Sequence, residues 1–248
     1  METKHVFVVV VVVAVGILLG IPLLAGLAKK GQNGESVQGD AQAQSKQNGA
    51  CERMSISELR KAAEQGDAEA QFKLGEVYMQ GKEIPRNDAE FVKWWRKAAE
   101  QGHPAAQTGL YFHFSFGSPE DRAEGGKWLD KALAQGFPDA QFQAAITDLM
   151  RDGDAVGAFN WLAKAAEQGH FCSMGLLGAF YAEGKAVEKD TKKAHMWASR
   201  CLEYGEGRDD AWGGKGKAKE ILDLVTREMK PEEISEAQKL AREWKPKE

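Results

Sequence analysis

The chain repeats the stretch Ala98-Ala99-Glu100-Gln101-Gly102, with substitutions, five times along its length. The glycines that end the copies stand at intervals of 36, 34, 33 and 36 residues, from Gly66 to Gly205. Self-similarity at a period of this length is typical of proteins built from stacked helical hairpins. The five copies occupy residues 62–66, 98–102, 132–136, 165–169 and 201–205.

A second motif keeps the same phase, namely a tryptophan followed three residues later by a lysine or arginine. It begins at Trp94, Trp128, Trp161 and Trp197. Apolar residues around it recur with the period of an amphipathic helix, and an earlier stripe in each unit does the same. Each unit is therefore predicted to hold two helices, with a glycine ending the second one in the left-handed conformation. The chain is predicted to be an all-α solenoid whose tryptophans pack between units.

These spacings divide the chain into consecutive segments. A half-repeat cap precedes four full repeats, and a helical cap follows them. The expected bounds are 55–66 for the first cap, 67–102, 103–136, 137–169 and 170–205 for repeats 1 to 4, and 206–248 for the last cap.

Residues 68–102 resemble the Sel-one-like repeat (SLR) family, a relative of the tetratricopeptide repeat. The pattern A-x-A-Q-x-x-L-G-x-x-Y, followed by K-A-x-x-W-x-x-K-A-A-x-x-G, is matched well there and again in residues 177–197. The resemblance extends from about Ser55 to Gly205 and implies a helix-turn-helix solenoid. Repeat 2 departs from the pattern because Tyr111 stands where the family has Gly, which puts close helix packing there in doubt.

The front of the chain is different in character. Residues 6–28 are 23 consecutive residues without a charge, and as a helix they would span ~34 Å, enough for a bilayer core. We expect an uncleaved transmembrane anchor, or alternatively a signal peptide cleaved at Ala28. The repeats are then expected to lie outside the cytoplasm, either anchored or, after cleavage, secreted or periplasmic. Residues 1–5 form a short tail, and 29–54 have the composition of a flexible linker.

Catalytic chemistry is not indicated by any motif. The formal net charge of −4 argues against a nucleic-acid partner. Neither a nucleophile motif nor metal-ligand spacing is present, so we expect no enzyme, no cofactor and no small-molecule substrate. The alternative, a hydrolase of cell-wall or β-lactam substrates, is implied by a resemblance to the cysteine-rich subset of the SLR family. That subset staples the two helices of a repeat, and a pairing of Cys172 with Cys201 is left open.

Binding of a protein or peptide on the solenoid surface is the expected function. The first helices of a solenoid line its concave side, and the outward stripe along them grows more apolar through the chain. The candidate binding residues are Phe72, Lys73, Glu76, Phe112, Phe142, Ile146 and Leu176. Two structural alternatives are open: the carboxy-terminal helices could cover Leu176 and Ala179, and Phe112 could fill space inside its irregular unit.

Overall fold

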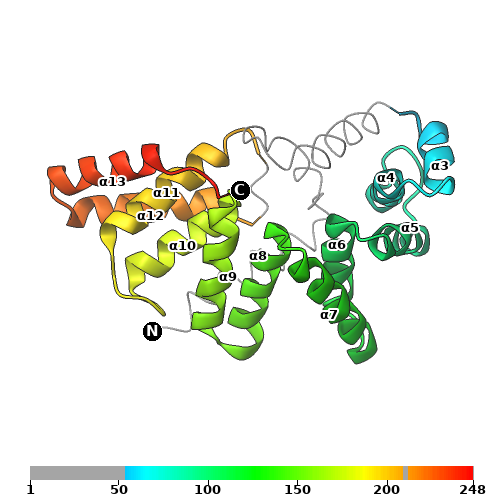
Figure 1. The fold of residues 1–248 in the computed structure, drawn as a ribbon, viewed down its shortest axis with the longest axis horizontal. Coiled ribbons are helices and arrows are strands. Elements are labelled where there is room, and N and C mark those ends of the chain that lie inside the picture. The colour runs from blue at the N-terminus through cyan, green and yellow to red at the C-terminus, as the bar shows by residue number, and fades with distance from the viewer. Residues whose placement is uncertain (1–53, 209–211, 248) are drawn as a thin grey trace. The chain divides into compact units, whose positions relative to one another are not determined.

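The computed structural model describes residues 54–208 and 212–247, and Figure 1 follows them from cyan to red. The expected tail, the segment 6–28 and the linker up to residue 53 lie outside these residues. Within them the chain is all-helical, with no strand, as predicted. The elements are α3 (Ile56–Glu64), α4 (Ala68–Gln80), α5 (Asp88–Glu100), α6 (Pro104–Phe114), α7 (Pro119–Ala134), α8 (Pro138–Thr147), the π-helical turn η1 (Asp148–Asp152), α9 (Ala155–Glu167), α10 (Phe171–Glu183), α11 (Thr191–Tyr204), α12 (Gly214–Glu228) and α13 (Pro231–Glu243).

Local signals in the sequence set the helix ends. The Asp67 carboxylate accepts a hydrogen bond from the Ala70 amide at 2.8 Å and so caps α4. His103 and His170 cap α6 and α10 in the same way, through a ring nitrogen. The predicted left-handed conformation is found at four of the glycines that end the second helices, namely Gly66, Gly102, Gly136 and Gly169, with φ between 72° and 97°. Gly205, at the end of α11, differs because it is right-handed, with φ −82°.

The described residues fall into two compact units, divided at Ala140. In the first, residues 54–140, helices α3 to α7 pack each against the next in the chain. Its largest fully buried side chain is Trp95, which is 1% exposed. A Cβ added at Gly75 or Gly109 would come within 2.4 Å of the Trp95 ring, so both first helices need glycine where they cross it.

The second unit, residues 141–247, is built around α10. This helix packs against α9, α11 and α12, while α13 packs against α11. Cys172 and Cys201 lie in the core of this unit as buried thiols. The carboxy-terminal helices thus continue the packing of the repeats, and they also cover part of α10.

Two expectations about packing need correction. Trp94, Trp128 and Trp197 are buried as predicted, but Trp161 is only half-buried. Close packing in repeat 2 is kept although Tyr111 replaces the glycine, because Gly125 on the partner helix α7 supplies the space. A Cβ at Gly125 would meet the Tyr111 carbonyl oxygen at 3.2 Å.

Candidate protein-binding surface

The first-helix face of residues 54–140 carries the first group of predicted site residues. We define this face by Glu69, Phe72, Lys73 and Glu76 of α4 and by Ala105, Thr108 and Phe112 of α6. The amino-terminal turn of α6 belongs to it, because the capping residue His103 bonds to Glu69 of α4. The two helices are therefore joined at the amino-terminal turn of α6.

Phe72 forms the floor of this face. Its ring stacks on Trp95 at 5.5 Å and on His103 at 4.6 Å between centroids. Its backbone carbonyl accepts a hydrogen bond of 3.1 Å from the Trp95 indole nitrogen. Phe72 is therefore buried, with 6% exposed, by contacts within the chain. It supports the face but offers a partner little area, contrary to its prediction as a binding residue.

Charged groups on the same face are paired with one another. The Lys73 ammonium lies 2.9 Å from the Glu76 carboxylate, whose side chain is only 8% exposed. Burial raises the pKa of the Glu76 carboxyl above its ordinary value, although Lys73 opposes the shift. The Nε2 atom of His103 lies 2.9 Å from Glu69. Its Nδ1 accepts from the Ala106 amide, so in the neutral ring the Nε2 proton is donated to Glu69.

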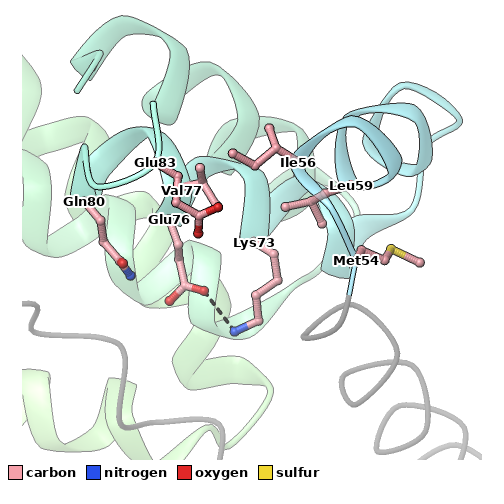
Figure 2. A pocket seen from close by; sticks show the side chains of 8 residues that line it. All are labelled: Met54, Ile56, Leu59, Lys73, Glu76, Val77, Gln80 and Glu83. Atoms are coloured by element: carbon pink, nitrogen blue, oxygen red, sulfur yellow. Dashed lines mark hydrogen bonds and ion pairs between the residues drawn. The ribbon is translucent and has the colours of Figure 1, made fainter. Parts of the chain in front are cut away.

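A small hollow adjoins the Lys73–Glu76 pair. Figure 2 shows it between α3 and α4, with Ile56 and Leu59 on one side and Val77 and Gln80 on the other. Its volume is about 170 Å3. Small-molecule sites usually enclose roughly 300–1,000 Å3, so this hollow suits a single side chain better than a substrate.

The carboxyl end of α6 is the most accessible apolar part of the face. Phe112 is half-buried, and its ring meets that of Phe116 edge to face at 5.7 Å. Phe116 is 61% exposed, the highest value among the large apolar side chains of the described residues. Phe114 is buried in the same helix and packs under the Arg96 guanidinium. The aromatic cluster is therefore divided between core and surface, with Phe112 at the border.

The predicted site residues of the second unit, residues 141–247, are buried or half-buried by other side chains of that unit. Phe142 is 2% exposed because His170 and Trp212 pack on its ring, at 4.9 and 5.3 Å. Ile146 is 8% exposed, and Leu176 is half-buried against the core. At the start of α12, Gly214 approaches α10 so closely that an added Cβ would lie 2.8 Å from the Cα of Cys172. On α10, the carboxy-terminal helix α12 thus covers part of the stripe, which was the structural alternative for repeat 4. The covering of Phe142 on α8 was not predicted.

The repeats of this chain match those of a known protein family. The family model described as Sel1 repeat matches residues 59–67, 68–103, 105–137, 138–170 and 173–201, which together are more than half of the chain. The chain belongs to the Sel1 repeat family.

Two solved structures are similar to this Sel1 repeat chain. One is a protective antigen present in uropathogenic Escherichia coli strains that displays an SLR fold, with a TM-score of 0.64 and 29% identity. That match covers 76% of this chain but only 40% of the antigen. The other is a Sel1 repeat protein from Oxalobacter formigenes, with a TM-score of 0.59, 27% identity, and coverage of 78% of this chain and 76% of that one.

Buried glutamines link successive Sel1 repeats, a role that the sequence analysis missed. The side chain of Gln71 donates to the Ala63 carbonyl and accepts from the Gln101 side chain, at 3.0 and 2.7 Å. Gln107 bonds in the same two ways, to Ala99 and to Gln135. Recurrence of Gln in both A-x-A-Q and A-E-Q-G was the available signal.

The W-x-x-K motif of the Sel1 repeats also has a physical reason. Each lysine ammonium lies over the ring of the tryptophan three residues before it, which is a cation–π contact. The distances to the ring centroid are 4.4 Å for Lys97, 4.1 Å for Lys131 and 4.4 Å for Lys164. The fourth repeat differs, because the Arg200 guanidinium lies over Tyr204 instead, at 4.6 Å.

The described helices carry neither a metal-ligand cluster nor a membrane-spanning stretch. No cluster of three or more His, Cys, Asp or Glu able to hold a metal ion is present in 54–208 and 212–247. Among the helices of these two ranges, none combines the length and the apolar character needed to cross a bilayer. The anchor predicted at residues 6–28 lies outside these ranges.

Proposed function

We propose that this protein is a binding scaffold that captures a protein or peptide segment on its first-helix face, at the carboxyl end of α6. The observation that carries the proposal is the Phe112–Phe116 pair, in which a large aromatic ring is left 61% exposed beside a half-buried one. Aromatic side chains supply much of the binding energy at protein interfaces. The Sel1 repeat fold supports the proposal in general, since helical repeats commonly form extended binding surfaces.

The paired charges on the α4 side of the first-helix face would give the site its selectivity. Lys73 and Glu76 present one cation and one carboxylate, held together at 2.9 Å. A partner that places an apolar side chain on Phe116 and polar groups over this pair would leave no buried charge without a partner. Phe112 and Phe116 would act as the anchors, and Lys73 and Glu76 would align the partner.

Two matched variants test the proposal. Phe116→Glu places a charge on the exposed ring position, whereas Val156→Glu does so on α9, a second helix, at a residue that is 57% exposed. Capture of partners from the native envelope and thermal melting are measured for both. Loss of capture in Phe116→Glu alone, with unchanged melting, supports the site. Equal capture by both variants would contradict it.

The cellular setting is part of the same proposal. Residues 6–28 would hold the scaffold at a membrane, with the repeats outside the cytoplasm and residues 29–54 as the tether. What supports this is the uncharged 23-residue stretch in the sequence. Mass spectrometry of the mature amino terminus tests it. An intact Met1 in the membrane fraction indicates an anchor, and a start at Lys29 indicates a cleaved signal.

We also propose that binding, and not catalysis, is the activity of the protein. The buried carboxyl of Glu76 is paired with Lys73, and His103 is used as a helix cap, so the polar groups of the face already have structural partners. A nitrocefin hydrolysis assay tests the alternative, a β-lactam hydrolase. Turnover above that of a heat-denatured sample would contradict the proposal.

A further inference from the structure

The last residues of the described chain return to the third and fourth repeats and fill a site there. Trp244 packs edge to face on Trp197 and Tyr204, with centroids 5.4 and 5.6 Å apart. The Lys247 amide donates to the Glu167 carbonyl at 2.7 Å, and its ammonium lies 2.9 Å from the Glu167 carboxylate. We call residues 244–247 the tail segment and these contacts the tail site. All of them lie within the second unit.

The tail site replaces a contact that the other repeats make within one helix. In repeats 1 to 3, a lysine covers the tryptophan three residues before it. In repeat 4, the corresponding Arg200 lies over Tyr204 at 4.6 Å and over Trp244 at 5.1 Å. The ring of Trp197 therefore receives Trp244 where its counterparts receive a lysine. The fourth repeat is built to hold an aromatic side chain from another segment.

The tail segment does not satisfy this site completely. Arg200 is 5% exposed, and its Nη1 atom bonds to Glu203 at 2.6 Å. Its Nε has no hydrogen-bond partner among the described residues. A buried donor left without an acceptor is unfavourable, because it has lost its hydrogen bond to water and gained none in return. A segment that supplies an acceptor to this atom would therefore bind the site better than the tail does.

The tail is also held by contacts that exchange readily. Its ion pair to Glu167 is exposed, with 72% of the Lys247 side chain and 39% of the Glu167 side chain accessible, and such pairs change an affinity by only about a few-fold. Trp244 is half-buried, and Lys245 and Pro246 are exposed. The tail segment is thus attached through one aromatic ring, one backbone hydrogen bond and one exposed ion pair.

We propose that the tail site is a second peptide-binding site, which the tail occupies in cis until a partner segment of the same chemistry displaces it. That partner is a peptide with an aromatic residue, preferably tryptophan, followed three residues later by a lysine or arginine. The ring enters between Trp197, Tyr204 and Arg200, and the cation pairs with Glu167. An acceptor near the ring would satisfy the Arg200 Nε. This site is separate from the first-helix face.

The test uses a fluorescent peptide of sequence Trp-Lys-Pro-Lys and the full chain. Removing the competing tail ring with Trp244→Ala should raise the affinity for this probe at least about tenfold over the unmodified chain. Lys247→Glu weakens the attachment of the tail without changing the aromatic packing, so it should also raise the affinity for the probe. This variant keeps the test decisive if Trp244→Ala does not fold. Lys245→Ala, at an exposed residue of the same segment, is the matched control and should leave the affinity unchanged.

A charge exchange sharpens the test. In the Trp244→Ala background, Glu167→Lys should reverse the preference, so that a Trp-Lys-Pro-Glu probe binds better than Trp-Lys-Pro-Lys. Phe116→Glu should leave probe binding unchanged, which separates this site from the first-helix face. Equal affinity of the unmodified chain and both tail variants for the probe would overturn the proposal. So would a probe that binds regardless of the charge at residue 167.

Discussion

Trp95 is the residue whose removal should damage the first unit most. Its ring is 1% exposed and is enclosed by the backbones at Gly75 and Gly109, which cannot collapse far onto an empty site. Replacing a buried tryptophan by alanine costs ~3–5 kcal/mol. Trp95→Ala also removes the hydrogen-bond donor of the Phe72 carbonyl, which adds about 1 kcal/mol. We expect a loss of about 4–6 kcal/mol, a large part of the ~5–15 kcal/mol that stabilises a typical protein.

Thermal unfolding followed by far-ultraviolet circular dichroism measures this loss. A destabilisation of this size corresponds to a fall in melting temperature of at least about 8 °C for a protein of this length. Trp161→Ala is the control, because Trp161 is half-buried and lies under Lys164, so it should cost only about 1–2 kcal/mol. Equal melting temperatures for the two variants would refute the assignment of Trp95 as the centre of the first unit.

Two further outcomes follow from the same structure. Gly109→Ala should destabilise the protein by about 1–3 kcal/mol, because the added Cβ would lie 2.4 Å from the Trp95 ring. In Gly126→Ala the added Cβ meets nothing within 4 Å, so this variant should stabilise α7 by up to about 1 kcal/mol. The midpoints of chemical denaturation of the two variants test both expectations. Burial lowers the pKa of His195 below its ordinary 6.5, so the folded state binds this proton less readily than the unfolded chain, and stability should fall as the pH drops below about 6.5. The raised pKa of Glu76 has the opposite effect on stability as the pH falls, so the effect of His195 has to be isolated by a variant. The melting temperatures of the parent protein and of His195→Gln are therefore compared between about pH 7 and pH 5. The melting temperature of His195→Gln should decline less. An identical decline in both proteins would show that His195 does not cause it.

Local features of the fold could be predicted from the sequence because they depend on neighbouring residues. The repeat spacing indicated the helices, and Asp67 and Gly102 marked helix ends through interactions within a few residues. The burial of Trp95 was not singled out, because Trp94 and Trp95 both fit one apolar stripe. The pattern does not show which of them faces Gly75 and Gly109.

Contacts between distant segments explain what the sequence analysis missed at the surface. Phe142 was interpreted as an anchor because its repeat position faces outward, yet Trp212 from outside the repeats covers it. The Tyr111 irregularity suggested poor packing, but Gly125, from the facing helix, restores the close approach. Likewise, nothing in the repeat pattern indicates that Trp244 returns to Arg200 and Tyr204.

Site-specific photo-cross-linking tests the central claim, which is that the first-helix face captures a protein partner. A photoreactive phenylalanine analogue is introduced in place of Phe116 in one protein and in place of Val156 in another, since both positions are well exposed, at 61% and 57%. We predict that irradiation in the cells that produce the protein links the partner to position 116 and not to position 156. Cross-linking that is equal at both positions, or stronger at position 156, would contradict the account.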